Sequence, residues 1–252
     1  MLQQFLELNT RLSRKSDRIA REVFGRRDGN FAFLESLLPG LLTESATVLD
    51  VGGGKRPSIP LELKQRLNLR VTGLDISGEE LARAPAGSYE HTIVGDVAQV
   101  ALEPQGYDLI FSSALMEHVT DVPGAIRNLA SAVRPGGRMA HFVPCGSAPF
   151  AMLNRVLGND QAKRLLYGIR PVTRATQGFP AYYHHCQPSE FGELIRGERL
   201  QVEELIPFYS SGYASFLFPL HLAEIAVQLT TMKVLRSMEH CESFVIVARK
   251  PA

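Results

Sequence analysis

Residue types that could hold a polar ligand follow the first strongly apolar segment of the chain. That segment, Thr47–Val51, contains Asp50 and runs directly into Gly52, Gly53 and Gly54. Glycines tolerate positive φ angles and let a backbone approach a flat, polar ligand closely. When such a loop follows a buried strand, it lies at the carboxyl end of a parallel sheet, where open α/β sheets bind ligands. Alone, the loop suits a dinucleotide, a nucleoside or no ligand.

Two further acids extend this pattern toward a nucleotide. Asp75 comes 21 residues after Gly54 and ends the next predicted strand, where a carboxylate can accept hydrogen bonds from ribose hydroxyls. Dinucleotide-binding domains also combine a glycine loop with an acid at the end of the second strand. Asp96 at the end of the third strand can in addition meet an adenine amino group. Ser112 and Ser113 end the fourth strand and are predicted to lie near the reactive end of the ligand.

An alternating series of strands and helices would position these residues. Alternation at these lengths indicates parallel βαβ units, and no segment repeats at a fixed period. The predicted strands are 47–51, 69–75, 91–94, 107–113, 138–143, 201–206 and 242–249. The predicted helices between them are 61–67, 78–83, 122–133, 188–196 and 216–238.

Two segments depart from this alternation. Residues 1–45 are predicted to form a helical cap, in which a short helix over 31–38 stops at Pro39-Gly40, and residues 46–252 a single domain. An insertion at about 144–188, with a helix over 151–167 and a loop rich in glycine, proline and aromatics, follows the fifth strand. An insertion at a strand's carboxyl end is expected to hang over the ligand crevice as a lid.

Composition restricts the partners and the surroundings. The 252 residues carry 27 lysines and arginines against 26 acids, so no overall charge favours nucleic acid. The three cysteines have neither disulfide nor zinc spacing and indicate reduced thiols in a cytoplasmic protein. We expect no signal peptide, no metal site and no membrane-spanning helix. The apolar segment 209–229 is predicted to pack on the sheet; the alternative is peripheral contact with the inner face of a membrane.

At this point the ordered motifs resemble those of class I S-adenosylmethionine-dependent methyltransferases, and Met116–Val119 resembles an element of the subgroup called type 11. The resemblance covers residues 46–143. It rests on five segments in order: Val48–Gly54, Gly73–Ile76, Gly95–Val97, Tyr107–Ser112 and Arg134–Arg138.

The resemblance implies a Rossmann-like α/β fold with a mostly parallel sheet of seven strands, the last antiparallel. It also implies S-adenosylmethionine as methyl donor and S-adenosylhomocysteine as product. By position, the expected donor-binding residues are Asp50, Gly52 and Gly54 at the methionine part, Asp75 and Ile76 at the ribose, Asp96 and Val97 at the adenine, and Ser112 near the sulfonium. One departure is Lys55-Arg56-Pro57, where the family commonly has another glycine.

The methyl acceptor is expected to be a hydroxyl of a small molecule or a sugar, including a lipid-linked glycan. A hydroxyl must lose its proton, and the candidate bases are His184 and His185, with His118 as the other candidate. The alternative is that these histidines only pack and hydrogen-bond. Methylation of nitrogen or carbon, and a non-catalytic partner protein with this fold, also remain open. Asp96 and the lack of a GxGxxG spacing argue against an NAD-dependent oxidoreductase. The oligomeric state is left open.

Overall fold

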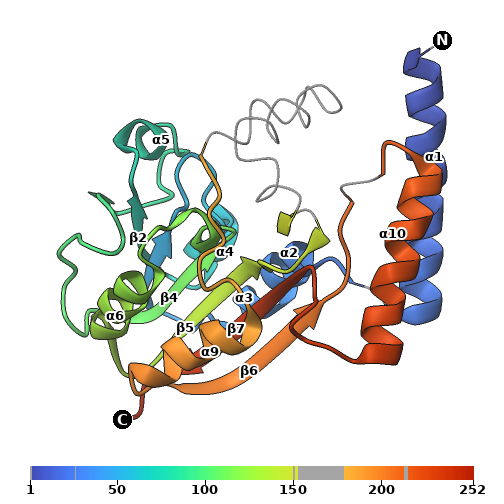
Figure 1. Cartoon of the computed structure of the whole chain (residues 1–252). Helices are drawn as coiled ribbons and strands as arrows, with labels where there is room; N and C mark the ends of the chain where they lie inside the picture. The colour runs from blue at the N-terminus through green and yellow to red at the C-terminus, as the bar shows by residue number, and fades with distance from the viewer. Residues whose placement is uncertain (1, 26, 150, 153–178, 213–214) are drawn as a thin grey trace.

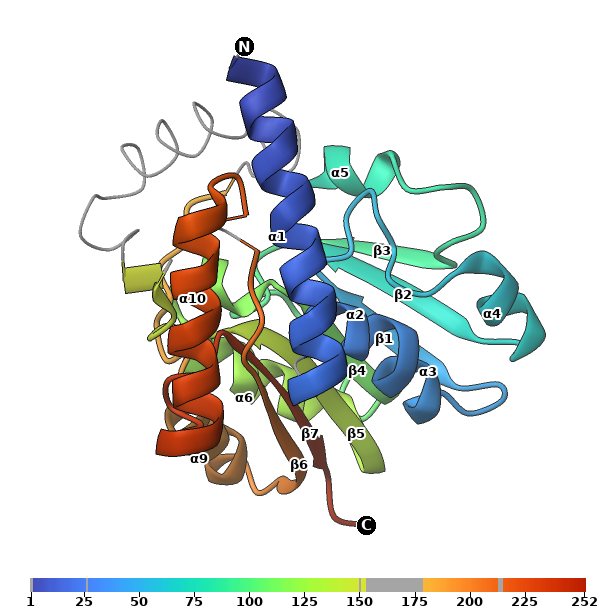
Figure 2. The same cartoon turned by 90° about the vertical axis from the view of Figure 1, so that its right-hand side faces the viewer.

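A seven-stranded sheet with helices on both faces forms the body of the protein in the computed structural model (Figures 1 and 2). The structure describes residues 2–25, 27–149, 151–152, 179–212 and 215–252. Most of the expected lid, including its predicted helix from residue 153 onward, lies outside these residues.

The sheet has the strand order β3-β2-β1-β4-β5-β7-β6. β7 runs antiparallel to both of its neighbours, and the other pairs are parallel. The predicted fold class, a mostly parallel sheet of seven strands with the last antiparallel, is therefore confirmed. The strands are β1 (Thr47–Val51), β2 (Arg70–Asp75), β3 (His91–Val94), β4 (Tyr107–Ser113), β5 (Val133–Pro144), β6 (Gln201–Phe208) and β7 (Ser243–Arg249).

Separate apolar cores fill the two faces of the sheet. One core lies under α6 (Val122–Ala132) and α9 (Pro188–Gly197). The other lies under α2 (Gly29–Ala32), η1 (Phe33–Leu37), α3 (Leu38–Leu41) and α4 (Leu61–Arg66). Because β1 is covered on both faces, four of its five residues are buried, as expected of a central parallel strand. Its carboxyl end is thereby held on a rigid base.

The segment from α2 to α3 corrects one detail of the expected N-terminal helices. The helix does not stop at Pro39 but continues to Leu41. Just before Pro39 the hydrogen bonding widens, and the Leu38 amide donates to the Phe33 carbonyl five residues back. A wider turn accommodates the missing proline N–H and its ring. Phe33 and Leu38 are fully buried in the second core, so this segment belongs to the sheet packing.

Helices α1 (Leu2–Phe24) and α10 (Phe218–Thr230) lie side by side at the edge of the body (Figures 1 and 2). α10 continues into the wide turn η4 (Thr231–Leu235). Polar groups join the two helices. The buried His221 imidazole of α10 lies 3.1 Å from Asp17 Oδ1 of α1 and 2.9 Å from Glu224 Oε2. Burial opposes its charge, but the two carboxylates prevail and raise the pKa of His221 to about 9.

The three cysteines are fully buried free thiols close to the end of β5. The Cys145 amide follows β5 and donates to the Glu242 carbonyl beside Cys241 (2.9 Å). The Gly146 amide donates to the Cys186 carbonyl (2.6 Å). The two described ends of the insertion are thus tied to each other and to Glu242, the residue that precedes β7.

Candidate donor and acceptor site

The glycine loop turns at the carboxyl end of β1 with two residues in the left-handed region. Gly52 has φ +79° and Gly54 has φ +47°. A Cβ on Gly52 would lie 2.8 Å from the Leu115 side chain, and one on Gly54 would lie 3.1 Å from Asp75 Oδ2. The loop can therefore carry no side chains at these positions without strain. It brings bare backbone next to the acid that ends β2.

Asp50 lies beneath this loop and is almost completely buried. Its Oδ2 accepts a hydrogen bond from the Ser58 amide at 3.3 Å and one from the Tyr89 hydroxyl at 3.2 Å. Burial raises the pKa of Asp50 to about 7, although both hydrogen bonds act to lower it. Asp50 is thus placed to hold the two ends of the loop together.

The unusual Lys55-Arg56-Pro57 sequence lies on the outer side of the loop. Lys55 Nζ lies 2.9 Å from Glu80 Oε2 on α5 (Gly78–Ala82), and the Arg56 side chain is exposed. The Arg56 amide donates to the Gly53 carbonyl and closes the turn. Lys55 thus points toward α5 and Arg56 toward solvent.

The acids of β2 and β3 lie at the same edge of the sheet. Asp75 Oδ1 accepts from the Ser77 amide at 2.8 Å, and burial raises the pKa of Asp75. The Ile76 side chain is 62% exposed, which is unusual for an isoleucine and offers an apolar surface beside the acid. Asp96 Oδ1 accepts from the Ala98 amide at 2.9 Å, and Val97 is buried.

Ser112 lies beside Val51 in register, but its hydroxyl does not point into the crevice. The residue is fully buried, and its Oγ lies 2.8 Å from Nδ1 of His141 on β5. His141 packs edge-on against Phe191 of α9, and burial lowers its pKa to about 3. The imidazole is therefore neutral. With its hydroxyl turned to His141, Ser112 could meet a ligand through its backbone only.

The next residue, Ser113, faces the opposite way. Its hydroxyl donates to Asn30 Oδ1 of α2 at 3.0 Å. The start of α2, capped by Asp28, is thereby held at the end of β4. Sequence reasoning did not indicate this neighbour, because Asn30 is 83 residues away along the chain.

A short helical turn, η2 (Met116–His118), follows β4 and binds the described end of the insertion. The Glu117 carbonyl accepts from the amides of Tyr182 (2.7 Å) and Tyr183 (3.1 Å). The Glu117 side chain is buried, and burial raises its pKa to about 8. Among the described residues its Oε2 has no hydrogen-bond partner. This carboxyl is a second group that sequence reasoning missed.

The three predicted histidines have different partners, and two of them, His118 and His184, bond to carbonyls in or near η2 and the end of the insertion. His118 Nδ1 lies 2.8 Å from the Pro180 carbonyl, and His184 Nδ1 lies 3.1 Å from the Thr120 carbonyl. A carbonyl only accepts, so each Nδ1 carries the proton and each Nε2 carries the lone pair. His185 is exposed, with Nδ1 3.7 Å from Glu190 Oε2. The structure thus brings His118 and His184 to one place in a basic tautomer.

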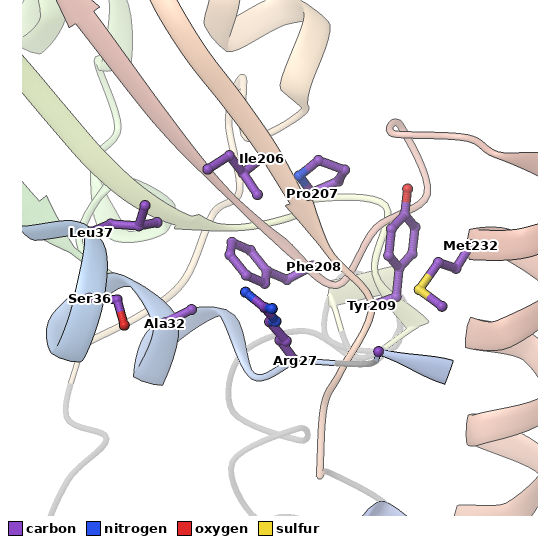
Figure 3. Close-up of a pocket in the computed structure, with 10 residues that line it drawn as sticks. Arg27, Ala32, Ser36, Leu37, Ile206, Pro207, Phe208, Tyr209 and Met232 are labelled. Atoms are coloured by element: carbon purple, nitrogen blue, oxygen red, sulfur yellow. The ribbon is translucent and has the colours of Figure 1, made fainter. Parts of the chain in front are cut away.

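A cavity of about 250 Å³ lies elsewhere, between the α2–η1 segment and the end of β6 (Figure 3). Its wall is mostly apolar and includes Phe208 and Met232, with Arg27 and Tyr209 as polar members. None of its lining residues belongs to the glycine loop or to the ends of β1, β2 and β4. Across the described part of the chain, no cluster of three histidine, cysteine or acidic side chains is arranged to hold a metal ion.

Comparison with known proteins assigns the chain to a family. The profile of a family described as "Methyltransferase domain" matches residues 20–200, well over half of the sequence. The chain is a member of the S-adenosylmethionine-dependent methyltransferase family. The resemblance predicted from the five ordered motifs is therefore confirmed, and S-adenosylmethionine is the methyl donor of this methyltransferase.

Curated relatives are about 30% identical to it over the aligned residues. A ubiquinone biosynthesis O-methyltransferase from Xanthomonas euvesicatoria is 29% identical over 178 residues, covering 68% of this chain and 70% of that protein. One of the same name from Pseudomonas savastanoi is 31% identical over 166 residues, covering 63% and 66%. The match thus spans about two thirds of the length of these relatives.

Solved structures support the fold. A Haloferax volcanii methyltransferase in complex with the activator Trm112 has a TM-score of 0.58 at 18% identity, covering 94% of this chain and 96% of that one. An S-adenosylmethionine-dependent methyltransferase from Mesorhizobium loti has a TM-score of 0.57 at 17% identity, covering 88% and 98%. At these identities the likeness concerns the fold alone.

The residues at the carboxyl edge of the sheet suit the donor. A Cβ on Gly52 or Gly54 would meet the Leu115 or the Asp75 side chain, so bare backbone lies at this edge of the sheet. Asp75 supplies a half-buried carboxylate, which suits ribose hydroxyls, and Ile76 supplies an exposed apolar surface beside it. When bound, the donor would supply an electrophilic methyl group on a sulfonium.

Proposed function

We propose that this methyltransferase methylates a hydroxyl oxygen of a small-molecule or sugar acceptor, with His118 or His184 accepting the proton. The observation that supports the proposal is the shared tautomer of these two imidazoles, each fixed by a carbonyl at Nδ1. The name of the curated relatives, O-methyltransferase, points in the same direction.

The proposed step balances with one base. The acceptor oxygen forms a bond to the methyl carbon while the carbon–sulfur bond breaks, and the electron pair stays on sulfur as S-adenosylhomocysteine. The hydroxyl proton passes to Nε2 of the histidine. A neutral imidazole with its lone pair on Nε2 serves as a general base near neutral pH. Positioning of the two reactants supplies much of the remaining acceleration.

We also propose the donor contacts expected from the sequence. Asp75 would bind the ribose hydroxyls with Ile76 beside them, and Asp96 and the Val97 backbone would bind the adenine. The glycine loop above Asp50 would hold the methionine part. Convergence of Gly54 on Asp75 Oδ2 supports this arrangement, since it brings the loop and the second acid together.

Radiolabelled methyl transfer to catechol, hexose and amine acceptors of matched size tests the acceptor class. We expect label in a hydroxyl class; label in amines alone would replace this proposal with N-methylation. With a working acceptor, His118→Ala and His184→Ala separate the two bases. Loss of the true base should lower kcat by about a hundredfold or more. His240→Ala, at another exposed histidine, is the control. Full turnover in the double variant would remove both residues from the chemistry.

We further propose peripheral contact with an anionic membrane through α10 and the rest of segment 209–229, assisted by α1. Large apolar side chains on both helices face outward, as do the basic ones of α1. The exposed apolar side chains are Phe5, Leu8, Leu12, Ile19 and Val23 on α1, and Leu220, Leu222 and Val227 on α10. The exposed basic ones are Arg11, Arg14, Lys15, Arg18 and Arg21. Apolar and basic side chains together favour anionic lipid. Among the described residues, no helix has the length and apolarity to cross a membrane.

Flotation with phosphatidylcholine vesicles, with and without phosphatidylglycerol, tests the membrane contact. We expect binding to the anionic vesicles only, and its loss in a Leu12→Glu, Ile19→Glu variant. Leu61→Glu on α4, at the far side of the sheet in Figure 2, is the matched control. Protein that stays in the soluble fraction with anionic vesicles contradicts the proposal. Self-association abolished by the same variant would assign the surface to a second copy.

A further inference from the structure

Tyr89 reaches the donor loop from a part of the chain that no sequence motif connects with it. It precedes β3, 39 residues after Asp50, yet its hydroxyl lies 3.2 Å from Asp50 Oδ2. Its ring packs with the second core, on the face of the sheet covered by α2 to α4. Burial raises the pKa of Tyr89 well above its usual value, so the hydroxyl keeps its proton and donates the hydrogen bond to Asp50.

Two glycines make room for this tyrosine. A Cβ on Gly73, in the middle of β2, would lie 2.8 Å from the Tyr89 ring. A Cβ on Gly53, the middle residue of the loop, would meet the Tyr89 hydroxyl first and lie 2.6 Å from Asp50 Oδ2. Neither glycine has a positive φ, so backbone conformation does not require a glycine at either place. A glycine is required there because Tyr89 and Asp50 occupy the space that a side chain would take.

Asp50 Oδ2 is the point where these contacts meet. It accepts from Tyr89 below the loop and from the Ser58 amide at the far end of the loop. If the Tyr89 hydroxyl were missing, the buried Asp50 carboxylate would lose one of its two hydrogen bonds. An acceptor that loses a donor there turns toward other partners or takes up a proton.

We propose that Tyr89 is a positioning residue for the methyl donor: its hydroxyl holds Asp50 under the glycine loop in the orientation and ionisation state that donor binding needs. The proposal rests on the proposed donor contacts of this loop. S-Adenosylmethionine is a cation at its sulfonium and its amino group. An ionised Asp50 therefore favours its binding, whereas a neutral Asp50 does not.

The ionisation of Asp50 depends on a small set of neighbours. Burial and the charge of Asp75 raise its pKa, and the hydrogen bonds from Ser58 and Tyr89 lower it. Lys55 of the loop is paired with Glu80 of α5, and no cation of the described residues is among the groups that shift the pKa of Asp50. Removing the Tyr89 hydroxyl should thus move the pKa of Asp50 upward from about 7. At neutral pH a larger fraction of the protein would then carry a protonated Asp50.

Calorimetric titration of the full chain with S-adenosylhomocysteine between about pH 6 and 9 tests the proposal on Tyr89→Phe. We expect binding about five- to tenfold weaker at neutral pH, as for the loss of one ordinary intramolecular hydrogen bond. We also expect the acid limb of the affinity profile to move to higher pH. A tyrosine with a purely packing role would not move that limb. In turnover assays the KM for the donor should rise while kcat at saturation stays near its original value.

Tyr107→Phe is the matched control, since Tyr107 of β4 is also a buried tyrosine, with its hydroxyl bonded to Thr72. It should leave donor affinity unchanged. An equal loss in both variants, or a Tyr89→Phe protein with unchanged affinity and profile, overturns the proposal. Wild-type protein that binds no S-adenosylhomocysteine instead overturns the donor contacts, and the role of Tyr89 with them.

A double-mutant cycle provides a second measurement that does not depend on turnover. Gly73→Ala should weaken donor binding and stability in the wild-type background, because the new methyl group meets the Tyr89 ring. In a Tyr89→Leu background the same substitution should have a much smaller effect. Equal effects in both backgrounds would show that Gly73 does not make room for Tyr89, and would overturn this part of the inference.

Discussion

Asp75 joins the glycine loop to the second strand, with Oδ2 next to Gly54 and Oδ1 on the Ser77 amide. We predict that Asp75→Ala weakens S-adenosylhomocysteine binding by about ten- to a hundredfold, because hydrogen bonds to a charged group contribute ~1.5–3 kcal/mol. Calorimetric titration measures the change. Glu79→Ala, a neighbouring exposed acid on α5, should bind normally. An unchanged affinity for Asp75→Ala would show that the ribose is bound elsewhere.

Individual site residues were predictable where strand ends fix their place. Asp75 and Asp96 end neighbouring parallel strands, so their meeting at one edge follows from the alternation of strands and helices. The direction of the Ser112 hydroxyl does not follow, because His141 lies on another strand. Tyr89 was also missed, although a third loop glycine and a glycine inside β2 were visible signals of a bulky neighbour.

At the scale of elements, α2 is fitted closely against three strands. A Cβ on Gly29 would lie 2.6 Å from Ser243 Oγ and 2.9 Å from Phe142 and Phe208. We predict that Gly29→Ala destabilises the protein by about 1–3 kcal/mol through overpacking. Urea unfolding measures the difference. Gly40→Ala in α3 is the control, since nothing lies within 4 Å of its Cβ position and alanine favours a helix. Equal stabilities would mean that α2 can shift away from the sheet.

The contact between α1 and α10 should depend on pH. The folded pKa of His221, about 9, lies above its unfolded value near 6.5. Its stabilising contribution is therefore complete below about pH 6.5 and is lost as the pH rises through about 9. We predict that hydrogen exchange in α1 accelerates over this interval relative to that in β1. His221→Gln should exchange quickly at all pH values. Wild-type exchange with no such relative change would contradict the ion pair.

Element positions were largely predictable, whereas contacts between distant elements were not. The strands follow from short apolar runs that end in acids or glycines. The continuation of the helix through Pro39 needs the buried Phe33 and Leu38, which hold the wide turn in place. The ion pair between Asp17 and His221 joins residues 204 positions apart in the sequence, so no local pattern indicates it.

For the whole molecule, buried ionisable groups should set the pH of greatest stability. Asp50 and Glu117 have folded pKa values of about 7 and about 8, above their unfolded values of 3.8 and 4.5. Their contribution is therefore complete below those unfolded values and is lost as pH rises from them through the folded values. The folded pKa of His141, about 3, lies below its unfolded value, so its contribution is lost as pH falls below about 6.5. We predict greatest ligand-free stability in mildly acidic buffer. Thermal unfolding across pH measures it.

Glu117→Gln provides the check on this pH dependence. It removes one buried titrating group, so the fall in melting temperature on the alkaline side should become shallower. Glu79→Gln, at an exposed acid, should leave the curve as it is. A wild-type protein whose melting temperature rises steadily from pH 5 to about pH 9 would contradict the upward pKa shifts of Asp50 and Glu117.

Burial of Cys145, Cys186 and Cys241 makes the native protein its own reporter of transient opening. A thiol reagent can reach these sulfurs only after β5, β7 or the base of the insertion parts from its neighbours. Alkylation kinetics therefore count rare excursions of the native ensemble without any introduced probe. If S-adenosylhomocysteine slows the modification, the carboxyl edge of the sheet opens together with β5 and β7. If it does not, the two regions open independently.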